Sequence, residues 1–188
     1  MKNYYSRQNL WMLFLVCAFP LHLWTLLMAF RDISWLSART NFGDALGVVS
    51  YGMIFALAES VLIFMPVLLC GFLVPKEWCR ERRLAVIAAM ILILSAWAIF
   101  SQIYAMRGWD IPWAWYEFLI GSAHPLRIIY AVVLGGLLPG IIFPIFTVYR
   151  NEKSLKSFLD AMDRISLLTT FYLFIDFLAL MVVVFRNI

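Results

Sequence analysis

Three ionisable side chains lie inside long apolar stretches of the sequence, where such groups are rare. His22, Glu59 and Asp176 each interrupt a hydrophobic run long enough for a membrane-spanning helix. Because an ionisable group in hydrocarbon is costly, each is by default a candidate for a functional position. Histidine and carboxylates exchange protons, so this set of residues could pass a proton along or hold a cation.

A glycine- and proline-rich segment in the fourth apolar stretch is expected at the same depth. Its sequence is GGLLPGIIFP, and both residue types weaken or break a regular helix. A broken helix frees backbone carbonyls, which transporters use beside intramembrane carboxylates to bind ions or substrates. The sequence therefore predicts a buried polar cluster for ions or protons. Its members are His22, Glu59, Asp176, Gly135, Gly136, Pro139 and Gly140.

The same residues also fit an explanation by packing alone. Glycine and proline are common in membrane helices, and small residues at four-residue spacing let helices approach each other. A buried carboxyl can be protonated and hydrogen-bond to a neighbouring helix. A lone His22 is more typical of a hydrogen-bonded packing residue than of a ligand. The sequence leaves the choice between packing and ion binding open.

A second candidate site lies in the aromatic connection RGWDIPWAWYEFLIGSAHP. Trp and Tyr favour the headgroup level, so residues 109–121 are predicted to form an interfacial helix. One interpretation is a lipid-facing aromatic belt. The other is a site for a lipid headgroup or an extracytoplasmic substrate, in which carboxylates and histidine do acid–base work. The residues of this site would be Trp109, Asp110, Trp113, Glu117, His124 and Arg127.

The composition assigns the chain to the integral membrane proteins. Of its 188 residues, 64% are hydrophobic and only 14% are charged, whereas globular domains carry about a quarter charged residues. The net charge of +4 would suggest nucleic acid in a soluble protein. Here the basic residues flank apolar spans, so no nucleic-acid partner is expected. Cys17, Cys70 and Cys79 share no metal-ligand spacing, and no metal or cofactor is expected.

The predicted fold is an all-α, single-domain membrane bundle with five transmembrane helices. The spans are residues 9–30, 45–74, 84–106, 126–149 and 165–185. A short polar loop is expected before the second span, with Asp44 as the cap of that helix. Residues 150–164 form an amphipathic lead-in to the fifth span, which either lies on the inner leaflet or continues the helix.

Small and polar residues fall on single faces of these spans at 3.6 residues per turn. Gly52, Ala56 and Ser60 repeat at the spacing that allows close helix approach. Glu59 is on the same side, so its carboxylate is expected to face protein rather than lipid. The corresponding faces are Ala18, His22, Thr25 and Ala29 in the first span, Ala88, Ser95 and Gln102 in the third, and Ser166, Thr169 and Asp176 in the fifth.

Lys and Arg residues predict the orientation, because they are enriched in cytoplasmic loops. Of the 15 basic residues, ten fall on the side of the N-terminus and five on the other side. The N-terminus is therefore expected in the cytoplasm and the C-terminus outside, in a plasma (inner) membrane.

The sequence contains no catalytic or ligand-binding motif that would identify an activity. Its loops are too short to form domains. The small and polar faces of its spans are suited to packing against a partner helix. We therefore expect a noncatalytic subunit or accessory protein that associates with membrane lipids and with a membrane-protein partner or a second copy of itself. The alternative is a small ion- or proton-coupled transporter with a mid-membrane carboxylate site. A lipid-modifying enzyme at the extracytoplasmic face ranks third.

Overall fold

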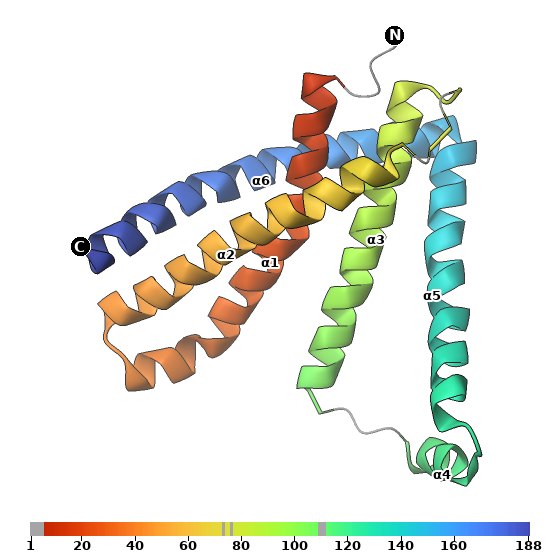
Figure 1. Cartoon of the computed structure of the whole chain (residues 1–188), viewed down its shortest axis with the longest axis horizontal. Helices are drawn as coiled ribbons and strands as arrows, with labels where there is room; N and C mark the ends of the chain where they lie inside the picture. The colour runs from red at the N-terminus through yellow and green to blue at the C-terminus, as the bar shows by residue number, and fades with distance from the viewer. Residues whose placement is uncertain (1–5, 73, 76, 109–111) are drawn as a thin grey trace.

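The computed structural model describes the chain except for residues 1–5, 73, 76 and 109–111 and the side chains of residues 33 and 37 (Figure 1). The helices of the described part are α1 (Arg7–Arg39), α2 (Phe42–Cys70), α3 (Arg80–Met106), α4 (Trp113–Gly121), α5 (Pro125–Arg150) and α6 (Glu152–Asn187). Five of them, all but α4, are long and apolar enough to cross a membrane. The prediction of an all-α integral membrane protein with five candidate spans is thus confirmed.

The connection between the first two helices is shorter than expected. The polar loop predicted before the second span is wrong, because α1 continues to Arg39 and α2 begins at Phe42. The Thr40 hydroxyl donates to the carbonyl of Leu36 at 2.7 Å, which satisfies a carbonyl at the end of α1. Asn41, rather than Asp44, caps α2, since its side chain accepts from the amide of Asp44 at 2.9 Å.

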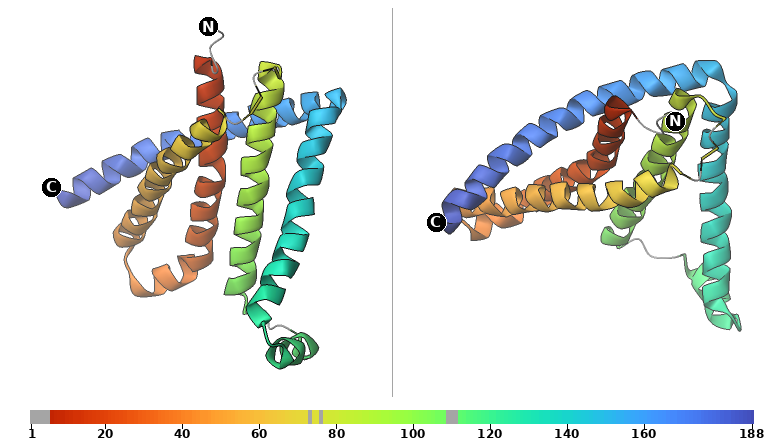
Figure 2. Two further views of the ribbon diagram at one scale, coloured as in Figure 1. Left: turned by 45° about the vertical axis from the view of Figure 1, so that its right-hand side comes forward. Right: turned by 45° about the horizontal axis from the view of Figure 1, so that its top comes forward.

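The helices form an open arrangement rather than a set of parallel rods. Figure 1 shows α6 crossing the ends of α3 and α5 at a steep inclination and then running beside α2 to the C-terminus. The further views agree, and they show α3 and α5 side by side, with α4 at their far end (Figure 2). α1 packs against α2, α3 and α6 and so connects the α2–α6 pair to the α3–α5 pair.

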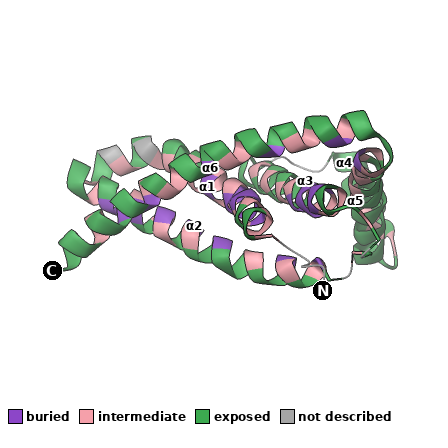
Figure 3. Ribbon diagram, turned by 90° about the horizontal axis from the view of Figure 1, so that it is seen from above, coloured by how far each residue is buried: buried purple, intermediate pink, exposed green. Residues whose placement is uncertain are grey.

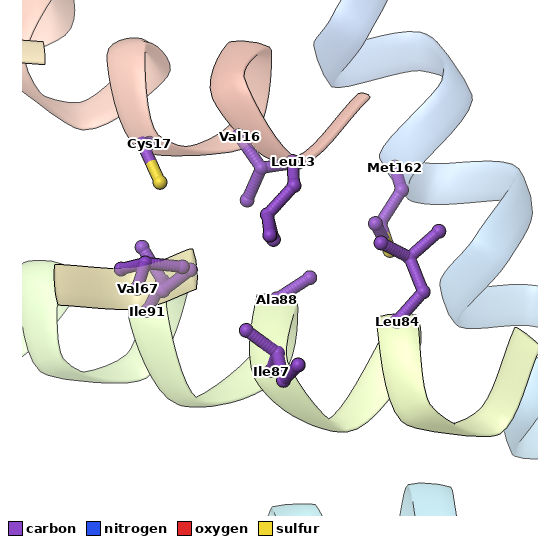
Figure 4. Close-up of a cluster of buried hydrophobic side chains, with 9 residues drawn as sticks. All are labelled: Leu13, Val16, Cys17, Val67, Leu84, Ile87, Ala88, Ile91 and Met162. Atoms are coloured by element: carbon purple, nitrogen blue, oxygen red, sulfur yellow. The ribbon is translucent and has the colours of Figure 1, made fainter. Parts of the chain in front are cut away.

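The buried core lies where α1, α2, α3 and α6 meet. Its largest cluster consists of Leu13, Val16, Cys17, Val67, Leu84, Ile87, Ala88, Ile91 and Met162 (Figure 4). A smaller cluster contains Ala85, Val148 and Leu155. Because Leu155 and Met162 belong to these clusters, the amphipathic lead-in is part of α6 and packs against this chain. By contrast, α5 is exposed along most of its length (Figure 3), and Val148 is its buried residue.

The C-terminal end of α6 is bound to the first turns of α2. The guanidinium of Arg186 donates to the carbonyl of Gly43 at 2.6 Å and to the carboxylate of Asp44 at 2.5 Å. The amide of Asn187 donates to the Tyr51 hydroxyl at 2.6 Å. Gly47 leaves room for the Arg186 guanidinium in this position, because an added Cβ would overlap it and the flexible Arg186 side chain would have to move.

The substitution Gly47→Ala should displace Arg186 from this contact. In a helix, alanine is favoured over glycine by about 1 kcal/mol, and Gly135→Ala provides the matched control because no atom lies within 4 Å of its added Cβ. The Arg186–Asp44 ion pair is half exposed, so its loss should cost no more than about 1 kcal/mol. In detergent unfolding, Gly47→Ala should therefore be less stable than Gly135→Ala, by up to about 1 kcal/mol. Equal free energies of unfolding would contradict this role of Gly47.

Candidate functional site

His22 of α1 and Asp176 of α6 form a buried polar pair. The exposed fractions of these residues are 0% and 2%. The His22 ring nitrogen Nε2 lies 2.8 Å from Oδ2 of Asp176, and Nδ1 lies 2.8 Å from the carbonyl oxygen of Ala18. A carbonyl only accepts hydrogen bonds, so Nδ1 carries a proton and donates it. The structure thus brings together two of the residues that the sequence places at the same depth.

A second proton is shared across the contact between His22 and Asp176. If it resides on Nε2, the pair is an imidazolium and a carboxylate; if it resides on the carboxyl, both groups are neutral. The Tyr172 ring covers the imidazole at a centroid distance of 6.0 Å. The other carboxyl oxygen, Oδ1 of Asp176, is buried and has no hydrogen-bond partner among the described residues. The pair can therefore exchange a proton within itself, and it also joins two helices.

Glu59 does not join this pair. Ala56 and Ser60 are buried on the predicted small-residue face of α2, but Glu59 itself is exposed. Neighbouring residues on a helix are separated by about 100°, so Glu59 lies at the edge of the packed face. In this chain Glu59 is exposed rather than buried, and whether its carboxylate faces protein or lipid in the membrane stays a prediction. Glu59 instead lines a groove between α1, α2 and α3.

The glycine- and proline-rich segment also lies apart from His22 and Asp176. The predicted break is wrong, because α5 is continuous from Pro125 to Arg150. A proline removes one backbone hydrogen bond, and the remaining bonds carry the helix past it. Gly135, Gly136 and Pro139 are exposed, whereas Gly140 is half-buried and lies against the Trp97 ring of α3.

The residues predicted at the outer interface do not form a cluster in the described part of the chain. Trp109 and Asp110 lie outside the described residues. Residues 113–121 of the predicted interfacial segment form α4, in which the indole of Trp113 donates to the Glu117 carboxylate at 2.5 Å. His124 and Arg127 are exposed at the start of α5, and no described hydrogen bond or ion pair joins them to Glu117. This arrangement gives the third candidate function, a lipid-modifying enzyme, no support.

His22 and Asp176 should be energetically coupled in a double-mutant cycle. Removal of one partner leaves the other buried without its hydrogen bond, which costs more than removal of both. We expect His22→Leu and Asp176→Leu each to lower the free energy of unfolding in detergent. The double variant should be less destabilised than the sum of the two, by about 1 kcal/mol. The same cycle with exposed His124→Leu in place of His22→Leu should be additive; additivity for His22 as well would contradict the coupling.

Comparisons with protein-family models, curated proteins and solved structures find no match to this chain.

Proposed function

We propose that this chain is a noncatalytic subunit of a membrane assembly, and that α5 is the helix that meets the partner. The observation that carries this proposal is the bare face of α5. Between Pro125 and Thr147, no residue of α5 is buried, although the helix is long and apolar enough to span the membrane. Within hydrocarbon, apolar surface alone does not drive helices together. The reason to expect a partner is therefore the backbone polar groups on this face.

Two backbone carbonyls of α5 lack their usual helical donors. Pro139 and Pro144 have no N–H, so the carbonyls of Gly135 and Gly140 receive no helical hydrogen bond from them. Gly135 and Gly136 have no side chain to cover the backbone, and nothing lies within 4 Å of an added Cβ at either position. A carbonyl exposed to lipid without a donor is costly. A partner helix packed closely against this face would shield the carbonyl and supply polar contacts.

The proposed setting is a plasma or inner membrane, with the N-terminus in the cytoplasm and the C-terminus outside. The excess of basic residues on the N-terminal side supports this orientation. The partner would span the same membrane and would be another protein or a second copy of this chain. Membrane lipids would cover the remaining apolar faces.

A photo-cross-linking residue placed on α5 should capture this partner in native membranes. We expect a discrete protein adduct from Leu138, which is exposed beside the glycines, but not from Phe174, which is similarly exposed on α6. Gly135→Leu should remove the Leu138 adduct, because residues three positions apart share a helix face and a large side chain there prevents close helix approach. The mass of the adduct distinguishes a second copy from a different protein. Absence of any protein adduct at Leu138, or equal adducts at both positions, would contradict the proposal.

A small ion- or proton-coupled transporter is the second candidate function. The location of Glu59 favours it, because the carboxylate lies near the middle of a candidate span and lines a groove instead of the core. Intramembrane carboxylates that face a cavity mark ion and proton pathways in many transporters. The proton shared by His22 and Asp176 provides a second exchangeable site in the same set of helices.

The transporter candidate predicts proton or cation flux from the purified chain in vesicles. Glu59→Gln and Asp176→Asn should each lower the flux at least about tenfold, because each removes a group that can release a proton. Asp160→Asn is the control, since Asp160 is an exposed carboxylate on α6 outside both polar sites. Flux that is absent from the parent chain, or unchanged in both variants, would exclude this candidate.

A further inference from the structure

The groove beside Glu59 is a cavity between three membrane helices. It has a volume of about 340 Å³, which lies within the range of small-molecule sites. α1 contributes Trp24, α2 contributes Glu59, and α3 contributes Ser95 and Gln102, while most of the remaining wall is aliphatic. Ser95 and Gln102 are two of the residues that the sequence places on one face of the third span. The structure therefore turns that polar face toward the one carboxylate of α2 that lies within its apolar stretch.

The Glu59 carboxylate has no partner of its own in this groove. No hydrogen bond or ion pair reaches it from the described residues, and the groove is lined by no Lys, Arg or His. A carboxylate in a membrane helix is costly when it stays charged and uncompensated. A cation in the groove would compensate it, and the nearby Trp24 ring would add a favourable cation–π contact.

The chemistry of the lining indicates which kind of cation fits. Calcium takes six to eight oxygen ligands, and magnesium keeps a strict octahedral shell. Glu59, Ser95 and Gln102 offer too few oxygen atoms to surround calcium, and the aliphatic wall makes no hydrogen bonds to the water molecules that magnesium retains. The groove has the volume of one small molecule and is too small for a helix, whose diameter is about 10 Å. An apolar wall with one carboxylate therefore suits an organic cation with an apolar body.

We propose that the groove between α1, α2 and α3 binds a membrane-partitioned organic monocation, with the positive charge at the Glu59 carboxylate and the apolar body against the aliphatic wall. Such a ligand reaches the site from the bilayer, in which its apolar body already dissolves. Ser95 and Gln102 accept or donate hydrogen bonds at the edge of the ligand. This site is separate from the α5 face, so its occupancy does not depend on the proposed subunit function.

Binding of tetraphenylphosphonium to the detergent-solubilised full chain tests the proposal by equilibrium dialysis. Glu59→Gln should weaken binding at least about tenfold, because it removes the charge and keeps the shape of the side chain. Ala98→Phe should have a similar effect by a different cause, since Ala98 lines the groove and a larger side chain would fill it. Asp160→Asn, outside the groove, should bind like the parent chain.

A neutral compound with the same aromatic body separates charge recognition from partitioning. Triphenylphosphine oxide should bind more weakly than tetraphenylphosphonium and should not distinguish Glu59→Gln from the parent chain. Helical content by circular dichroism and elution volume confirm that each variant is folded. Equal binding of tetraphenylphosphonium to the parent and to both groove variants would overturn the proposal, as would no binding at all. Carbodiimide coupling of Glu59 to a lysine of a copurified protein would also overturn it, because a protein side chain would then occupy the groove.

Discussion

The hydrogen bond between His22 and Asp176 is a buried polar contact that joins α1 to α6. Lipid tails are as apolar as leucine, so membrane helices are held together by close packing and by polar contacts. This pair supplies such a contact in the middle of two long helices, and Arg186 supplies another between α6 and the start of α2. Together they bind α1, α2 and α6 into the best-packed part of the molecule.

The features that suggest function lie outside this well-packed part. Glu59 is on α2, but it faces a groove whose opposite wall is α3. The glycines of α5 lie on a helix that packs mainly against α3, and most of its surface is exposed. Buried polar groups that satisfy each other stabilise a fold, whereas polar groups left without partners in hydrocarbon require an occupant. The hydrogen-bonded atoms of His22 and Asp176 belong to the first kind, whereas the Glu59 carboxylate and the Gly135 carbonyl belong to the second, as does the buried Oδ1 of Asp176.

The sequence predicts the five candidate spans and the common depth of His22 and Asp176, because both follow from hydrophobic length and helical rise. It cannot predict which side of α2 faces which neighbour. Glu59 and Ser60 are adjacent, yet one is exposed and the other is buried. Periodicity predicts that Ser60 lies on a packed face, but how far that face extends toward Glu59 depends on the angles at which the other helices cross α2. The sequence also does not predict the contact between Arg186 and Asp44. Gly47 is only compatible with a close approach of α6 to α2.

The continuous course of α5 changes the meaning of its prolines. A broken helix would place carbonyls inside the molecule, but an unbroken one leaves the Gly135 carbonyl on an outer surface. α3 then has a contact on each side: Ser95 lines the groove, and Trp97 lies against Gly140 of α5. Residues two positions apart on a helix point in nearly opposite directions. A shift of α3 in response to an occupant of the groove would therefore change the contact between Trp97 and Gly140 of α5.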